Sequence, residues 1–190
     1  MAMSLNILCT TLLSLLILYT TLLSSQNRAF STHLLDNLTL FTHCESPLTH
    51  PGRLLYIDLD TVITGNMDAI ASYQGPFATL STRGFENEQE YADGYNSSLM
   101  AWDAGFGHEV AHAFERLGKH IVDLCVSDQD YLEMMILNAD LVQDIWPNLV
   151  REYKSECTEF VPPGTAIVTF PLIPKPHSYP SSWIADLWIE

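Results

Sequence analysis

Residues 53–68 read Arg-Leu-Leu-Tyr-Ile-Asp-Leu-Asp-Thr-Val-Ile-Thr-Gly-Asn-Met-Asp, an apolar run that ends in two carboxylates, Asp58 and Asp60. Residues two apart on a β-strand point to the same face, so the pattern predicts a strand over residues 53–59 that presents both carboxylates together at its C-terminal end. Such a pair can hold one hard divalent cation that also binds phosphate oxygens. The stretch therefore indicates an α/β fold that handles a nucleotide diphosphate, or else a buried strand followed by a polar turn.

Length and charge narrow the class of protein. The chain has 190 residues and a formal net charge of −15, which fits one domain with a sizeable core. A chain this acidic lacks the basic stripe that neutralises phosphates along a nucleic acid, so we expect no nucleic-acid partner. An excess of carboxylates suits divalent cations, although it also simply solvates a surface.

The N-terminal segment has a different character. Residues 5–25 carry no charged side chain and are mostly apolar, which is long enough to span a bilayer. We therefore expect residues 1–30 to be a signal peptide or a retained anchor, with a membrane-associated, endomembrane or Golgi-like location. The first positive charge, Arg28, follows the segment instead of preceding it. A buried helix in a cytoplasmic protein is therefore the alternative.

Periodicity predicts the order of elements in the rest of the chain. Strands are expected over residues 53–59, 77–81, 97–102 and 167–170, and helices over 67–73, 107–119 and 128–138. Ser127 is a suitable N-cap for the last helix, and residues 171–190 read as an extended tail. Because strands alternate with helices, the class is α/β with a mainly parallel sheet flanked by helices. Residues 31–190 then form one domain, with ligands at the C-terminal ends of its strands.

The four cysteines form no metal-binding or redox motif. Cys9, Cys44, Cys125 and Cys157 are widely separated, without a Cys-x-x-Cys pair. We interpret them as free thiols, with Cys125 buried. A disulfide between Cys44 and Cys157 would require an oxidising compartment.

Four segments, taken in order, resemble one enzyme family. Tyr-Ile-Asp-Leu-Asp-Thr-Val-Ile-Thr-Gly-Asn-Met-Asp at 56–68 resembles the DxD segment of GT-A-fold glycosyltransferases, in particular family 8 and its bacterial relatives. Residues 95–102 resemble the family's "NSG-apolar-M" strand, and residues 127–132 its "DQD" helix start. Residues 168–177, Val-Thr-Phe-Pro-Leu-Ile-Pro-Lys-Pro-His, resemble the C-terminal "FHGxPKPH" segment. The resemblance covers about residues 50–180 and implies a GT-A-like fold.

The resemblance implies a hexosyltransferase that uses a nucleotide-sugar donor and a sugar or protein acceptor. Asp58 and Asp60 would bind Mn²⁺, or Mg²⁺, and through it the diphosphate, while Lys175 would meet the phosphates. A cation and a lysine suit a leaving group on which negative charge develops. His177 matches a histidine of the C-terminal segment, but the family's metal-ligand histidine falls at Pro171, which cannot coordinate metal through its side chain.

The resemblance also implies residues around the sugar. Asn96 and Ser97 would contact the donor sugar. Asp128 and Gln129 would lie beside the anomeric carbon as catalytic residues, where a polar side chain can stabilise oxocarbenium character. On their own, these residues also fit a turn and the first turn of a helix, where the dipole favours acidic side chains.

The family's first nucleotide-binding strands precede its DxD segment, whereas here 57 residues precede Asp58 and about 20 of these form the apolar segment. We therefore expect an N-terminally truncated GT-A-like domain that lacks those strands. A non-catalytic remnant of the family is the alternative function.

A second motif points to different chemistry. Residues 108–112 read His-Glu-Val-Ala-His, which on a helix places His108 and His112 on one face with Glu109 as a general base, as in a zinc peptidase. Neither Glu115 nor Gly118 supplies the third ligand of a metzincin, and Glu133 would have to serve. The alternative is the solvent-facing side of a helix whose other side carries Val110, Phe114 and Leu117.

Overall fold

The computed structural model describes residues 53–85, 94–103, 106–117, 120, 124–125, 127–173, 175–178 and 183–187. The apolar segment at 5–25, the region 1–30 and Cys44 lie outside these residues. Among the residues that are described, no helix is long and apolar enough to cross a membrane. The chain forms two compact units. One comprises Met1–Leu55 and Trp102–Asn138, and the other comprises Tyr56–Ala101 and Ala139–Glu190.

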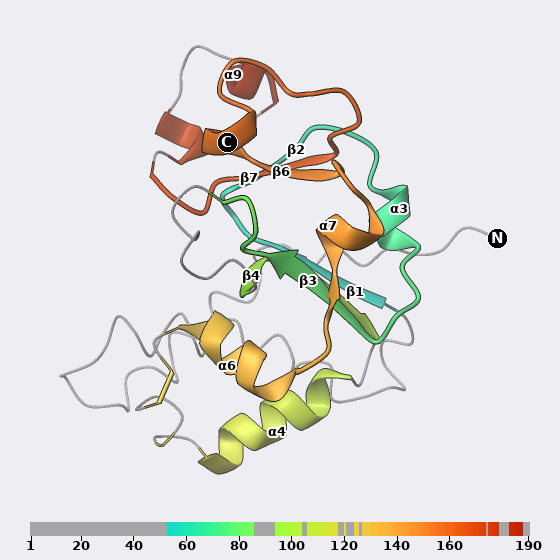
Figure 1. The fold of residues 1–190 in the computed structure, drawn as a ribbon, viewed down its shortest axis with the longest axis vertical. Coiled ribbons are helices and arrows are strands. Elements are labelled where there is room, and N and C mark those ends of the chain that lie inside the picture. The colour runs from blue at the N-terminus through green and yellow to red at the C-terminus, as the bar shows by residue number, and fades with distance from the viewer. Residues whose placement is uncertain are drawn as a thin grey trace. The chain divides into compact units, whose positions relative to one another are not determined.

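The strands form two sheets. The larger has the order β1-β4-β3-β5, with β1 at Arg53–Ile57, β4 at Tyr95–Asp103, β3 at Phe77–Ser81 and β5 at Asp140–Leu141 (Figure 1). The smaller has the order β2-β7-β6, with β2 at Thr61–Ile63, β7 at Ile167–Thr169 and β6 at Val150–Glu152. Strand β7 pairs antiparallel with β2 and parallel with β6, and β3 pairs parallel with β5. The chain is a mixed α/β protein with sheets flanked by helices, as predicted.

The second unit has two well-buried centres. All five residues of β3 are buried, because this strand lies inside its sheet between β4 and β5. The smaller sheet carries a separate apolar cluster, which consists of Val62, Tyr153, Cys157, Val168, Phe170 and Ile184. Within it the rings of Tyr153 and Phe170 stack with centroids 4.5 Å apart.

The described part of residues 171–190 does not form an extended tail. It contains the 3₁₀ helix η2 at Pro176–Ser178 and the helix α9 at Trp183–Leu187. Ile184 is fully buried in the cluster of the smaller sheet, and the Trp183 indole N–H donates to the carbonyl of Cys157 at 2.8 Å. The prediction of an extended tail was therefore wrong.

The first unit contains two of the predicted helices. Helix α6 at Asp128–Met135 begins with the predicted cap, because Ser127 accepts from the N–H of Asp130 at 3.1 Å and the Asp130 carboxylate accepts from the N–H of Ser127 at 2.9 Å. Helix α4 spans Gly107–Leu117. The Tyr131 hydroxyl donates to the carbonyl of Val110 at 2.6 Å, which joins the two helices.

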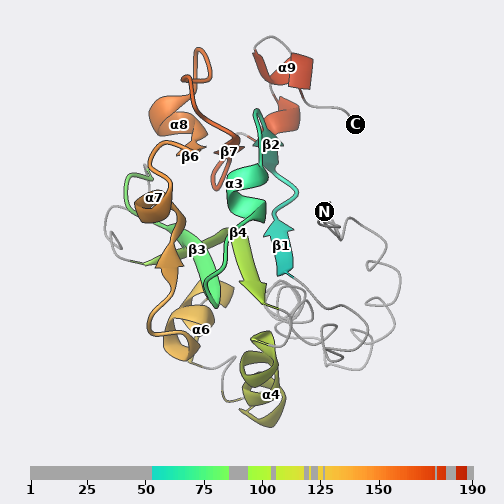
Figure 2. The same cartoon turned by 90° about the vertical axis from the view of Figure 1, so that its right-hand side faces the viewer.

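Several short elements were not predicted. They are β2, β5 and β6, and the helices α7 at Val142–Ile145 and α8 at Tyr153–Glu156. Helix α8 is set by the buried Glu152, whose two carboxylate oxygens accept from the N–H groups of Lys154 and Ser155 at 2.9 and 2.7 Å. Figure 2 shows α7 and α8 along the orange part of the chain, between β5 and β7 in sequence. Elements of two to four residues contain too little of a period to be recognised.

Candidate functional site

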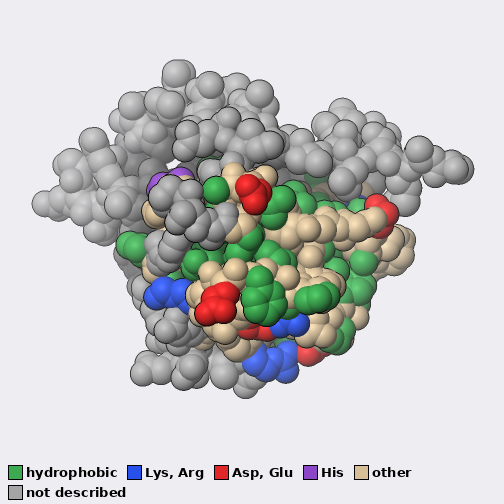
Figure 3. Space-filling model, turned by 90° about the horizontal axis from the view of Figure 1, so that it is seen from above, with side chains coloured by type: hydrophobic (Ala, Val, Ile, Leu, Met, Phe, Trp, Pro, Cys, Tyr) green, Lys and Arg blue, Asp and Glu red, His purple; other side chains and the backbone are tan. Residues whose placement is uncertain are grey.

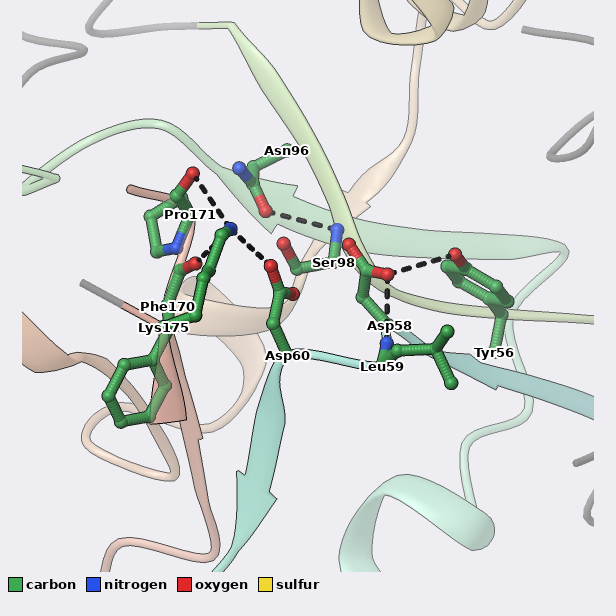
Figure 4. Close-up of polar contacts among 9 residues, drawn as sticks. All are labelled: Tyr56, Asp58, Leu59, Asp60, Asn96, Ser98, Phe170, Pro171 and Lys175. Carbon is green, nitrogen blue, oxygen red and sulfur yellow. Dashed lines mark hydrogen bonds and ion pairs between the residues drawn. The ribbon is translucent and has the colours of Figure 1, made fainter. Parts of the chain in front are cut away.

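Asp58 and Asp60 lie on a turn, not on a strand. Strand β1 ends at Ile57 and β2 begins at Thr61. The N–H of Asp58 donates to the carbonyl of Ser98 at 2.9 Å, which continues the contact between β1 and β4 by one residue. The chain then bends, so the two carboxylates leave the backbone from the connection between the larger and the smaller sheet (Figure 4). The predicted strand over 53–59 was two residues too long.

The Asp58 side chain is held by its neighbours. One carboxylate oxygen accepts from the N–H of Leu59 at 2.8 Å and from the hydroxyl of Tyr56 at 3.4 Å. Burial raises the pKa of the Asp58 carboxyl, and the negative charge of Asp60 raises it further, against the opposing effects of the Leu59 N–H and the charge of Lys175. Asp58 is therefore harder to ionise in the folded protein than in the unfolded chain.

The Asp60 side chain meets a residue from the far end of the domain. Its Oδ2 atom forms an ion pair with the ammonium of Lys175, 115 positions later, and the two side chains are 23% and 31% exposed. The other carboxylate oxygen, Oδ1, is buried and has no hydrogen-bond partner among the described residues. Lys175 also donates to the carbonyl oxygens of Phe170 at 2.7 Å and Pro171 at 3.4 Å. Figure 4 shows the ammonium between these three oxygens.

The residues present do not match a site for a hard divalent cation. Such ions take six or more oxygen ligands, and here the ammonium of Lys175 lies against Asp60. His177 is exposed on η2, and the part of the chain that the structure describes contains no group of three or more His, Cys, Asp or Glu residues able to hold a metal. Pro171 supplies its carbonyl to Lys175. The Mn²⁺ prediction for Asp58 and Asp60 stays a prediction.

The predicted sugar contacts lie on β4. Asn96 is buried, and its side-chain oxygen accepts from the N–H of Ser98 at 3.1 Å, while the carbonyl of Ser98 accepts from Asp58. Ser97, between them in sequence, is half-buried. The fold therefore joins the Asn96 segment to the Asp58 turn through Ser98. Contact of Asn96 and Ser97 with a sugar stays a prediction.

Asp128 and Gln129 belong to the other compact unit. They are the first two residues of α6 and are both half-buried, and the capping contacts of that helix use Asp130 instead. Their predicted catalytic role depends on a bound sugar and is untested.

The His-Glu-Val-Ala-His motif lies on α4. Glu109 and His112 are exposed, while Val110 and Phe114 are buried, as expected for an amphipathic helix. Leu117, predicted for the buried side, is 45% exposed, because it is the last residue of the helix. The side chain of His108 lies outside the described residues. The zinc site therefore stays a prediction, and Glu133 on α6 is half-buried.

Sequence reasoning missed the main-chain atoms of this site. The carbonyls of Phe170 and Pro171 hold Lys175, and the carbonyl of Ser98 holds the turn at Asp58. Every residue carries a main-chain carbonyl, so no residue type marks these acceptors. The Pro-Lys-Pro sequence was the only available signal, since two prolines restrict the backbone around Lys175.

Comparisons with known proteins find a distant likeness among solved structures. No protein-family model matches the chain, and no curated protein does. Among solved structures, the chain is similar to the glycosyltransferase GlyE of Streptococcus pneumoniae TIGR4, with 13% sequence identity and a TM-score of 0.48. The match covers 72% of this chain and 38% of that one, so the chain spans well under half the length of that protein. A likeness this distant does not assign a family.

Proposed function

We propose that this chain is a glycosyltransferase-like protein that binds a nucleotide sugar at the Asp58–Asp60 turn. The observation that carries the proposal is the meeting of three segments in one compact unit. The DxD-like, NSG-like and PKPH-like segments resemble the family only as sequence, yet Lys175 reaches Asp60, and the Asn96 segment reaches Asp58 through Ser98. Unrelated loops would not be expected to converge in the same combination.

The chemistry fits this arrangement. Transfer from a nucleotide sugar releases a nucleoside diphosphate, and positive charge at the phosphates lowers the barrier to its departure. Lys175, which pairs with Asp60, supplies such a charge. Mn²⁺ or Mg²⁺ on Asp58 and Asp60, which the resemblance implies, would supply it only by displacing the ammonium. Asn96 and Ser97 are the candidates for contact with the sugar. Asp128 and Gln129 are the candidates for stabilising the anomeric carbon.

A non-catalytic protein that still binds a nucleotide sugar is the second candidate. It is favoured by Pro171, which stands where the family's metal-ligand histidine would be and contributes a carbonyl to Lys175. Membrane association through residues 5–25 remains part of the proposal for either candidate. The acceptor would then be a sugar or protein in the same compartment.

The test is donor binding by isothermal titration calorimetry, with the full chain and a panel of nucleotide sugars. We expect one donor to bind. The Asp60→Asn variant should bind it at least about tenfold more weakly, which corresponds to a loss of about 1.4 kcal/mol in binding free energy. Asp144→Asn is the matched control, because Asp144 is an exposed carboxylate of the same unit that pairs with Arg83. A wild-type chain that binds no nucleotide sugar would overturn the proposal.

Release of nucleoside diphosphate separates the two candidates. An active transferase hydrolyses or transfers the donor that it binds, and Asp128→Asn should then lower the rate by orders of magnitude with little change in donor affinity. That pattern marks a group that acts mainly in the transition state. Binding without any release would leave the non-catalytic candidate.

A further inference from the structure

We propose that the ammonium of Lys175 is the resident cation of this site and takes the place of a divalent metal on Asp60. The inference rests on the proposed function for the identity of the ligand, a nucleotide sugar. The claim that the ammonium replaces a metal ion depends only on the contacts among Lys175, Asp60, Phe170 and Pro171.

The ammonium has the surroundings of a bound cation. A lysine carries three N–H donors and no acceptor, and here three oxygens face it: Asp60 Oδ2, the Phe170 carbonyl at 2.7 Å and the Pro171 carbonyl at 3.4 Å. Carboxylate and main-chain carbonyl oxygens are also the ligands that hard metal ions take. The ammonium therefore uses Asp60 Oδ2 and two carbonyl oxygens that a metal ion here would also take, and it leaves Asp60 Oδ1 without a hydrogen-bond partner among the described residues.

The fold fixes the oxygens on one side of the ammonium. Phe170 is 2% exposed and stacks on Tyr153 in the apolar cluster of the smaller sheet, directly after β7. Its carbonyl is therefore held in position by the core and not by a mobile loop. Moving Lys175 away would leave this carbonyl, and the partly buried Asp60 carboxylate, without their donor, which costs free energy.

The fold also fixes the lysine. Lys175 directly precedes η2, whose Ser178 N–H donates to the carbonyl of Lys175 at 2.9 Å, and Pro176 is buried. The backbone that follows Lys175 is thus held by this hydrogen bond and by the burial of Pro176. Lys175 therefore reaches Asp60 from a fixed point of the backbone, although ordering its side chain still costs entropy.

The second carboxylate does not restore a metal site. Asp58 turns toward Tyr56 and the N–H of Leu59 (Figure 4). A divalent ion between the two aspartates would lie close to the ammonium, and like charges at such short range repel strongly where water is scarce. Mn²⁺ would have to displace Lys175 in order to bind.

The same geometry leaves one place for a phosphate. The longest of the three contacts of the ammonium is the one with the Pro171 carbonyl, at 3.4 Å, which is at the outer limit of a hydrogen bond. A phosphate oxygen could replace this weak acceptor without breaking the pair with Asp60. The ligand that fits is a nucleoside diphosphate bound through a lysine, without metal.

The experiment measures Mn²⁺ binding by the full chain without any nucleotide, using calorimetry and the thermal unfolding midpoint. We expect no stoichiometric binding and no shift for the wild type. The Lys175→Met variant keeps most of the stem but removes the charge, so it should gain Mn²⁺ binding and a higher unfolding midpoint with Mn²⁺. Asp60→Asn added to Lys175→Met should abolish that gain. Lys154→Met, a half-buried lysine of the same unit, is the control and should gain nothing.

Two results would overturn the proposal. One is stoichiometric Mn²⁺ binding by the wild type that Asp60→Asn removes, and the other is a folded Lys175→Met variant that gains no Mn²⁺ binding. If Lys175→Met does not fold, the wild-type measurement alone decides. No nucleotide sugar is used, so a failure here is distinct from a failure of donor binding. Where a donor does bind, a chelator should leave its affinity unchanged.

Discussion

The Asp58–Asp60 turn and helix α4 carry the two sequence patterns that indicate metal binding, and they differ in how far the rest of the chain encloses them. The turn is enclosed by Lys175 and by main-chain carbonyls from distant parts of the chain. On α4, Glu109 and His112 are exposed to solvent. The difference shows that a short motif has a defined chemistry only when other segments of the chain close around it.

The stability of the two regions should differ in the same way. On α4 the buried face holds the helix in place, whereas at the turn the charged groups themselves are the contacts. Substitutions on the apolar face of α4 should therefore lower the free energy of unfolding. Substitutions of the motif residues on α4 should leave it unchanged. At the turn, the motif residues and Lys175 should be sensitive.

The largest effect is expected for Phe114→Ala on the buried face of α4. Phe114 is 9% exposed and packs edge-to-face on Tyr131, with ring centroids 5.6 Å apart. Removing a buried ring of this kind typically costs about 3 kcal/mol or more. Urea unfolding of the variant measures the loss. A cost below about 1 kcal/mol would mean that α4 is not held by this face.

The next largest effect is expected for Lys175→Ala at the turn. Breaking a fully buried ion pair costs about 3–5 kcal/mol, and because the Lys175 and Asp60 side chains are 31% and 23% exposed, screening reduces the expected cost to about 1–3 kcal/mol. Arg83→Ala is the control, since Arg83 and Asp144 form a pair that is 52% and 60% exposed. Its cost should stay below about 1 kcal/mol. Equal losses in the two variants would contradict an enclosed site.

A smaller effect, with a defined pH dependence, is expected for Asp58→Asn. The folded state raises the pKa of Asp58 above its ordinary value of 3.8, chiefly through burial. Its ionisation therefore costs stability, and this cost appears as the pH rises from the ordinary value through the folded-state pKa. The asparagine stays neutral, so the variant should be more stable than the wild type at about pH 7 and equal to it at about pH 3.

Thermal unfolding of both proteins across this pH range is the measurement. A variant that is less stable than the wild type at neutral pH would show that the contacts of the ionised Asp58 outweigh its burial.

The smallest effect is expected on the motif face of α4. Replacing both Glu109 and His112 by alanine should change the free energy of unfolding by less than about 0.5 kcal/mol, as is usual for exposed positions. Stoichiometric Zn²⁺ in the purified wild type that is lost in this variant would show that the motif on α4 binds metal. It would support the zinc peptidase instead.

The sequence predicted the long elements well and the site in part. Strand β3 was found with its bounds, because Gly75 and Pro76 break the chain just before it and an acidic stretch follows from Gly84. Ser127 was found because a capping residue has a specific side-chain chemistry. The end of β1 was misplaced, since the alternation of Asp58 and Asp60 continues the strand pattern across a turn.

The ion pair of Lys175 with Asp60 was not predictable from the sequence. The resemblance placed both residues near a diphosphate but assigned each to a different partner. Their contact depends on where η2 and the carbonyl of Phe170 lie, and these positions follow from tertiary packing around Ile184 and Tyr153. Helix α9 was missed for the same reason, because a five-residue helix is stabilised by what it packs against.

The buried thiol of Cys157 offers a way to observe the opening of this packing. Cys157 is free and fully buried beside Phe170 in the cluster of the smaller sheet, and burial raises its pKa to about 11. Because the thiolate is the reactive form, an alkylating reagent should modify Cys157 only when the cluster opens. The labelling rate then measures the local opening free energy. A ligand that binds at Lys175 would slow the labelling, since the carbonyl next to that lysine belongs to the same cluster.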